Sequence, residues 1–333
     1  MKETLPIAHC PLPMAPGGGS ARSVVAGRQA AADRGFSLVE LLVAMTLLTL
    51  IVVALMAVFS STQRAFRASV TQTDVLEGSR AAIDLISTDL RNLTPCDGTS
   101  NYVVQNVGQS GLNFFVTNNG YLDFTISSYN YKPLMQSLVG SSSGALRTNS
   151  LQWFFVLGRN NTSWTGAGYI VNSSSSSPLY PLYRFYAQTN VNLNPVTLFY
   201  LFETYLINSQ WTNMSHVMDG VVHLNVRAYD PNGYWLTNGY AYWQTNRPQN
   251  IWFSAPFYGE VGFACYSNAV PAAVELQLGV LEDRALQRTA SLGIPGSIGL
   301  SPAQLTYLQN QSGHVHLFRQ RVTVPNVDPT AYP

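Results

Sequence analysis

Residues 36–59 read FSLVELLVAMTLLTLIVVALMAVF, a run of 24 residues in which Glu40 is the only charged side chain. At about 1.5 Å of rise per residue, a helix of this length spans roughly 36 Å, more than the ~30 Å thickness of a hydrocarbon core. The run therefore predicts a membrane-spanning helix. A cleaved signal peptide fits poorly, because its apolar core is about 7–15 residues long and is followed by a small-residue cleavage site.

The residues before this run predict which way the helix crosses the membrane. Residues 1–35 are rich in Ala, Pro and Gly and show no hydrophobic periodicity. Their four basic and two acidic side chains are Lys2, Arg22, Arg28 and Arg34, and Glu3 and Asp33. Because positively charged flanks stay in the cytoplasm, we expect a cytoplasmic N-terminus and an exported, periplasmic remainder.

Glu40 is a costly residue at this position. A charged side chain at the centre of a membrane helix costs about 2.5–3.5 kcal/mol on insertion scales. Glu40 lies five residues into the run, near its cytoplasmic end. We therefore expect a neighbouring group that offsets part of this cost.

The residues around Glu40 resemble a processing site. Residues 34–40, RGFSLVE, are similar to the cleavage and methylation site of type IV prepilins and type II secretion pseudopilins. In that family an inner-membrane aspartic peptidase, the prepilin peptidase, cuts after the Gly and methylates the new N-terminal Phe. The resemblance implies cleavage after Gly35 and N-methylation of Phe36. It also implies that Glu40 neutralises an N-terminal amine when filaments assemble.

Elementary electrostatics agrees with this interpretation. Cleavage would create an ammonium group on Phe36, and the Glu40 carboxylate four residues along is the available counter-charge in a medium of low dielectric constant. The alternative is a plain signal anchor in which Glu40 has no such role. The leader of 35 residues is long for the family, and a start at Met14 would shorten it to 22 residues without altering the site.

The helix is expected to continue beyond the membrane. No proline occurs between Phe36 and Leu93, and over residues 60–94 mostly apolar side chains recur at spacings of 3 and 4, as in an amphipathic helix. The stripe consists of Leu76, Ser79, Ile83, Ile86, Leu90 and Leu93, and the charged residues off it are Arg80, Asp84, Asp89 and Arg91. We expect the stripe to pack on the next domain, and Pro95 to end the helix near Thr94.

Residues 97–333 predict a β-rich domain, because short runs rich in β-branched and aromatic residues alternate with turn residues. Strands are expected at 102–107, 112–117, 121–126, 151–157, 180–187, 197–206, 221–229, 272–281 and 314–324. Two short helices are expected at 282–288 and 302–311, the second with Ser301 as its N-cap. The predicted fold class is α+β: a long N-terminal membrane-spanning helix packed on a β-rich C-terminal periplasmic domain.

The second half of the chain adds to the resemblance. Residues 216–235, HVMDGVVHLNVRAYDPNGYW, and 271–283, PAAVELQLGVLED, are similar to the J-type minor pseudopilins of type II secretion. Residues 316–329, HLFRQRVTVPNVDP, resemble a related group, the Verru-Chthon cassette protein C family. The resemblance is specific over 34–94 and weaker over 216–325, and residues 97–215 are interpreted from their pattern alone.

Charge and motifs favour a protein that is not an enzyme. With 18 basic and 17 acidic residues, the chain has no long-range field to hold nucleic acid. It contains neither a phosphate-binding loop nor a dinucleotide fingerprint. The Ser-rich residues 140–144 also suggest no binding motif, and we interpret them as an exposed loop. We expect no cofactor.

Two histidines near the C-terminus are candidates for metal ligands. His314 and His316 would share one face of a strand, which permits two metal ligands. No Cys or acidic cluster is adjacent to them in the sequence, so we interpret them as strand-surface histidines and expect no metal.

Glu282 and Asp283 lie between a strand and a helix, which favours a role in capping the helix start over catalysis.

The cysteines raise the question of a disulfide. Cys10 lies in the leader, which leaves Cys96 and Cys265 in an exported protein. Two cysteines in an oxidising compartment often pair, and a bridge would join the end of the helix to the distal sheet. The sequence leaves two alternatives open, a Cys96–Cys265 disulfide or two buried thiols.

These observations predict a minor pseudopilin or pilin-like structural subunit of a type II secretion or type IV pilus-like filament. Its bulky domain suits the tip or an initiating complex better than every position of a shaft. Expected partners are the prepilin peptidase, other pseudopilins or minor pilins, and an inner-membrane assembly platform. The alternative is a membrane-anchored envelope module that binds carbohydrate or protein and does not polymerise.

Overall fold

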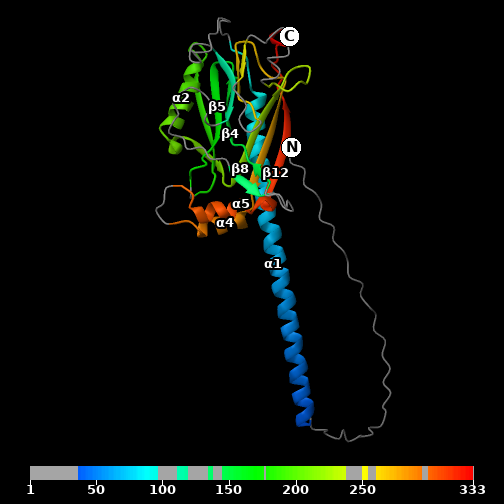
Figure 1. Ribbon diagram of the computed structural model, residues 1–333. Helices are drawn as coiled ribbons and strands as arrows, with labels where there is room; N and C mark the ends of the chain where they lie inside the picture. The colour runs from blue at the N-terminus through cyan, green and yellow to red at the C-terminus, as the bar shows by residue number, and fades with distance from the viewer. Residues whose placement is uncertain are drawn as a thin grey trace, which may run out of the picture. The chain divides into compact units, whose positions relative to one another are not determined.

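The computed structural model describes residues 37–96, 111–118, 134–137, 145–175, 178–237, 250–253, 260–294 and 299–332. The chain divides into two units, Met1–Ser61 and Thr62–Pro333. Helix α1, Leu38–Arg91, is one continuous helix of 54 residues that begins in the first unit (Figure 1). The unbroken helix predicted from the absence of proline is confirmed, although it ends three residues before Thr94.

The C-terminal part of α1 carries the predicted buried stripe, with differences at single positions. The buried side chains on this face are Val75, Ser79, Ala82, Ile83, Ile86, Ser87 and Leu90 and, just past the helix, Leu93. Leu76 was expected on this face but is 41% exposed, and Val75, one residue earlier, is buried instead. Asp89 was expected to lie off the stripe but is also buried, because it forms an ion pair with Arg184.

The larger sheet has seven antiparallel strands in the order β7-β6-β5-β4-β1-β10-β9. In that order their bounds are Ser215–Met218, Leu182–Asn190, Ser163–Val171, Gln152–Arg159, Leu112–Asn118, Phe263–Tyr266 and Ile251–Phe253. Phe114 and Phe154 belong to the core cluster that contains the α1 stripe, whereas Phe115 and Phe155 belong to a second cluster. Successive side chains of a strand point to opposite faces, so both faces of this sheet are covered.

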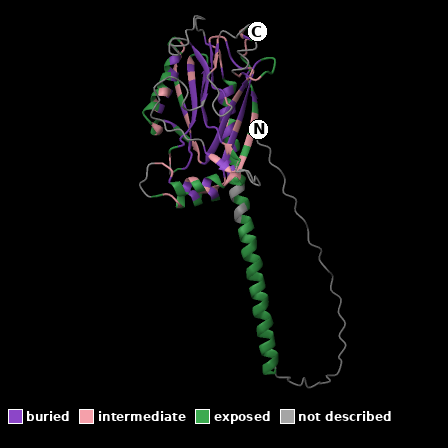
Figure 2. Cartoon of the chain, in the orientation of Figure 1, coloured by how far each residue is buried: buried purple, intermediate pink, exposed green. Residues whose placement is uncertain are grey.

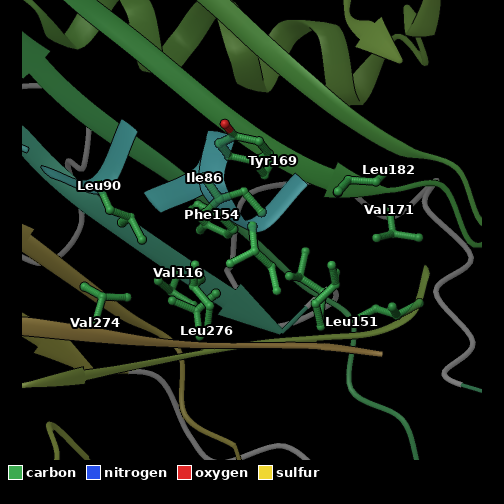
Figure 3. Close-up of a cluster of buried hydrophobic side chains, with 14 of the residues drawn as sticks. Ile86, Leu90, Val116, Leu151, Phe154, Tyr169, Val171, Leu182, Val274 and Leu276 are labelled. Carbon is green, nitrogen blue, oxygen red and sulfur yellow. The ribbon is translucent and has the colours of Figure 1, made fainter. Parts of the chain in front are cut away.

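A smaller sheet packs against the first core cluster, the one that contains the α1 stripe. It contains β12, Val315–Thr323, β11, Ala273–Leu281, and β8, Val221–Tyr229, in that order and all antiparallel. Val274 and Leu276 of β11 lie in one cluster with Ile86 and Leu90 of α1 and with residues of the larger sheet (Figure 3). Strands β2, Met135–Ser137, and β3, Leu146–Thr148, form a separate antiparallel pair.

Helix α2, Val196–Ile207, shows that the strand predicted at residues 197–206 was wrong. Aromatic and β-branched residues suggested a strand, but the buried side chains recur at helical spacing. They are Val196, Leu198, Phe199, Phe202 and Leu206. The helix start also has a local signal, because the Asn194 side chain accepts a hydrogen bond from the Val196 backbone at 3.1 Å and Pro195 precedes the first helical residue.

Strand β5 was not predicted from the sequence, because Gly166 and Gly168 interrupt its apolar pattern. A Cβ atom at Gly168 would lie 2.7 Å from the ring of Phe202, so glycine at this position allows α2 to approach the sheet closely. The other strands that the sequence did not reveal are β2, β3, β7, β9 and β10, each three or four residues long. Segments this short carry too little periodicity to be recognised.

The remaining strand predictions are confirmed with shifts at their ends, as β1, β4, β6, β8, β11 and β12. The strands predicted at 102–107 and 121–126, and the loop at 140–144, lie outside the described residues.

The two short helices near the C-terminus are confirmed. They are α4, Asp283–Ser291, and α5, Pro302–Gln309. Ser301 caps α5 as predicted, because its hydroxyl accepts from the Gln304 backbone while the Gln304 side chain accepts from the Ser301 backbone. Short 3-10 turns occur at Trp211–Asn213, Ser312–His314 and Pro329–Ala331.

Candidate functional site

The start of α1 is a capping box formed by Ser37 and Glu40. The Ser37 hydroxyl accepts a hydrogen bond from the Glu40 backbone N–H at 3.2 Å. In return, Oε2 of Glu40 accepts from the Ser37 backbone N–H at 2.9 Å and from the Ser37 hydroxyl at 3.1 Å. This exchange satisfies backbone donors that a helix start otherwise leaves without a partner.

The capping box gives Glu40 a local role that the interpretation of the sequence missed. The signal was present, since a Ser followed three residues later by a Glu before an apolar run marks a helix start. Oε2 takes both donors of Ser37, and Oε1 accepts no hydrogen bond from the described part of the chain. The carboxylate can therefore hold the helix start with one oxygen and receive a cationic group with the other.

The first part of the helix that begins at this box has an apolar surface. Within α1, the segment Leu38–Phe66 is long and apolar enough to cross a membrane, and its most apolar stretch buries nothing in the protein. Figure 2 shows this part of α1 as exposed throughout. Among the described residues it is the one helix with these properties, and it contains most of the span predicted at 36–59.

A comparison with known families gives this site a class. Residues 31–58 match the family described as the prokaryotic N-terminal methylation motif. No curated protein and no solved structure matches the chain significantly. The motif is the site at which the prepilin peptidase acts, so it indicates a type IV pilin-like or pseudopilin-type subunit. Together with the membrane-capable helix, it indicates single-pass anchoring in the inner membrane.

The matched segment contains all three residues singled out by the sequence: Gly35, Phe36 and Glu40. Gly35 and Phe36 lie outside the described residues. Cleavage after Gly35 and methylation of Phe36 therefore stay predictions from the sequence.

The structure brings a carboxylate to His314 and His316, which the sequence did not suggest. His316 lies on β12, whereas His314, predicted on the same strand, belongs to the 3-10 turn just before it. Nδ1 of His314 lies 2.9 Å from Oε2 of Glu282, and Nε2 of His316 lies 3.0 Å from Oε1. Glu282 occupies the N-cap position of α4 and Asp283 lies in its first turn, as predicted for acidic residues at a helix start, but the Glu282 side chain makes no capping hydrogen bond. Within the described ranges, no group of three or more His, Cys, Asp or Glu residues is arranged to hold a metal ion.

The two histidines favour the ionised form of Glu282. Burial raises its pKa, but the hydrogen bonds and charges of His314 and His316 act more strongly together and the net pKa is lowered. The cluster therefore joins the start of α4 to the start of β12, and we interpret it as structural.

No disulfide joins Cys96 and Cys265. Both are buried, but Cys265 belongs to the core cluster that contains the α1 stripe, and Cys96 belongs to the cluster around α2. The larger sheet lies between these clusters. The bridge that the sequence left as an alternative is therefore absent, because the two side chains lie on opposite faces of one sheet.

Proposed function

We propose that this chain is a minor pilin-like structural subunit of a type II secretion or type IV pilus-like filament. The observation that carries the proposal is the Ser37–Glu40 box at the start of an exposed apolar helix, inside a matched methylation motif. The prepilin peptidase cleaves between Gly35 and Phe36 and methylates Phe36. The subunit has no catalytic function.

Cleavage gives the free oxygen of Glu40 a partner. The new amine on Phe36 is an ammonium group, and it lies one residue before Ser37, whose own N–H already binds Oε2. Ser37 keeps this N–H after cleavage, so the capping box survives processing. Oε1 can then receive an N-terminal ammonium, either from the same chain or from a neighbouring subunit, and so offset the cost of a carboxylate in the membrane.

The size of the exported region favours the tip or an initiating complex. The described residues of the unit Thr62–Pro333 include the larger and the smaller sheet, the strand pair β2–β3, and helices α2, α4 and α5 in addition to α1. A subunit this large is hard to place at every position of a filament shaft. The resemblance of residues 216–235 and 271–283 to J-type minor pseudopilins, and of 316–329 to the Verru-Chthon cassette protein C family, points the same way. Its partners are other pseudopilins or minor pilins and the inner-membrane assembly platform.

Two substitutions of Glu40 test the assembly role. Glutamine at this position still completes a capping box but carries no charge, whereas alanine removes both the cap and the charge. Glu40→Gln and Glu40→Ala should both insert into the inner membrane and both fail to join other prepilin-type proteins of the same organism. The measurement is capture of those tagged proteins from detergent extracts after co-expression.

The control for this experiment is Ser37→Ala. It removes the hydroxyl from the box but leaves the charge of Glu40 and the backbone N–H of Ser37, and it should assemble. Normal capture with Glu40→Gln would refute the charge role. Failure of every variant and of the natural chain to capture companions would instead favour an anchored envelope module that does not polymerise.

A further inference from the structure

The smaller sheet ends in a long strand whose outer edge pairs with no strand of the described part of the chain. β12 lies at the outer side of the order β12-β11-β8 and pairs with β11 along its nine residues (Figure 1). The edges of the larger sheet are β7 and β9, of four and three residues. Short edge strands are one way in which proteins avoid unwanted strand pairing. β12, with nine residues, is not shortened in this way.

The hydrogen bonds at the two ends of β12 show which of its backbone groups face outward. The Glu282 N–H donates to the His314 carbonyl, and the Val324 N–H donates to the Ala272 carbonyl, each at 3.0 Å. In an antiparallel pair every second residue bonds to the neighbouring strand, so the even-numbered residues of β12 bond to β11. The outward-facing backbone groups belong to Val315, Leu317, Arg319, Arg321 and Thr323.

These outward groups are uncovered in the described structure. None of the five residues has a backbone hydrogen bond to any described segment other than β11. Leu317, Arg319, Arg321 and Thr323 are exposed and Val315 is partly exposed. The edge thus offers up to five N–H donors and five carbonyl acceptors in the spacing of a strand.

The side chains along this edge give it a positive charge. Arg319 and Arg321 point to the same face of the sheet, because they are two residues apart. Arg319 lies 2.7 Å from Glu275, but its side chain remains 61% exposed. The guanidinium of Arg321 lies 4.3 Å from the centre of the Tyr229 ring, which fixes its position without neutralising its charge.

A second copy of the chain is a poor occupant for this edge. Antiparallel pairing of two β12 strands with complete overlap would place Arg319 opposite its own counterpart. A shift of two residues toward the C-terminus would place Arg319 opposite Arg321. Like charges directly opposite each other on paired strands are destabilising, so the edge disfavours pairing with itself.

We propose that β12 is a strand-addition site, which accepts an extended acidic segment of a companion filament subunit as a fourth strand of the smaller sheet. The backbone edge supplies the affinity, and Arg319 and Arg321 select glutamate or aspartate on the incoming strand. This proposal rests on the proposed function, since it names the surface through which such a subunit would bind its neighbour.

The binding test uses the full mature chain in detergent micelles and two fluorescent nine-residue peptides. One peptide alternates valine with glutamate, and the other alternates valine with lysine. Fluorescence anisotropy should show binding of the glutamate peptide and at least about tenfold weaker binding of the lysine peptide. Leu317→Pro removes one outward N–H and no bond to β11, so it should weaken the glutamate peptide about tenfold.

Charge variants provide the matched comparison. Arg321→Glu should reverse the preference between the two peptides. Arg288→Glu makes the same charge change on the exposed side of α4 and should leave both affinities unchanged. Arg321→Glu keeps the proposal testable if Leu317→Pro alters the fold, which the melting temperature of each variant would reveal.

Three results would overturn the proposal: equal binding of the two peptides, binding of neither, or a dimer of the natural chain that Leu317→Pro abolishes. The last result would assign the edge to a second copy. Capture of companion subunits is measured separately on the same variants. If capture persists while peptide binding fails, the filament role stands and only the strand-addition site is lost.

Discussion

Arg184 and Asp89 form a two-point ion pair that joins strand β6 to helix α1. Nη2 of Arg184 lies 2.8 Å from Oδ1 of Asp89, and Nε lies 2.9 Å from Oδ2. The hydroxyl of Tyr169 on β5 donates to the same carboxylate, and burial raises the pKa of this tyrosine, so it stays protonated. One carboxylate on the helix therefore fixes the helix against two neighbouring strands.

The first prediction concerns the stability of this contact. Asp89→Asn removes the charge that neutralises Arg184, and both side chains are at most 18% exposed. Loss of one partner from a buried pair costs about 3–5 kcal/mol, because the remaining charge stays desolvated. We expect Asp89→Asn to lower the free energy of unfolding by an amount near this range, measured by urea denaturation followed by tryptophan fluorescence.

The matched control is Asp84→Asn. Asp84 is an exposed residue that precedes Asp89 on the same helix. It should change the free energy of unfolding by less than about 0.5 kcal/mol, as is usual for surface substitutions. Equal effects of the two substitutions would show that the pair with Arg184 does not stabilise the domain.

The second prediction concerns processing. The prepilin peptidase must accept a small residue before the bond that it cuts, so Gly35→Leu should leave the leader of 35 residues attached. The natural chain should yield a mature protein that begins at methylated Phe36, observed by intact-mass analysis. Gly27→Leu, a substitution elsewhere in the leader, should be processed normally. A natural chain whose mature form begins at any other residue would show that the site is wrong.

The sequence predicted the parts of the fold that depend on local pattern. The apolar run, the absence of proline and the spacing of Ile83, Ile86 and Leu90 were sufficient for helix α1. Strands β8 and β11 were also found almost to the residue, because their apolar runs are long and are bounded by turn residues.

Features that depend on tertiary contacts were not predictable in this way. The burial of Asp89 requires Arg184, which is 95 residues away in the sequence. The glycines of β5 interrupt its apolar pattern, and only the tertiary contact of the Phe202 ring with Gly168 accounts for glycine in this strand. Glu282 meets His314 and His316 only because β11 and β12 pair in one register. At the N-terminal site, by contrast, the Ser37–Glu40 box was readable from spacing alone.

The third prediction is a pH dependence that arises from His223. Burial and the positive charge of Arg147 lower the pKa of this histidine from 6.5 to about 4, against a hydrogen bond with Gln277 that raises it. Below pH 6.5 the unfolded chain binds a proton at this residue that the folded chain does not. The domain should therefore lose stability as the pH falls from 6.5 toward 4, by roughly 3 kcal/mol in total.

The variant His223→Gln removes this proton uptake. As the pH falls from 6.5 to 5, its free energy of unfolding should decrease less steeply than that of the natural chain. His216→Gln provides the comparison, because it makes the same substitution at a histidine whose side chain is 46% exposed. Parallel curves for the natural chain and His223→Gln would contradict the assignment.

The last prediction is that the mature chain keeps both cysteines reduced in the oxidising periplasm. Burial raises the pKa of the Cys265 thiol, which suppresses the reactive thiolate, and the larger sheet separates it from Cys96. Iodoacetamide should label neither residue in the native protein and both in urea without a reductant, as counted by intact mass. Dithiothreitol should leave the melting temperature of the natural chain unchanged. Cys265→Ala is the control: it loses one site of labelling, and its melting temperature should be equally insensitive to the reductant. A disulfide would make the natural chain lighter by two hydrogens, allow labelling only after reduction, and lower the melting temperature when dithiothreitol is added. Those results would establish a Cys96–Cys265 bridge and contradict the separation of the two thiols by the larger sheet.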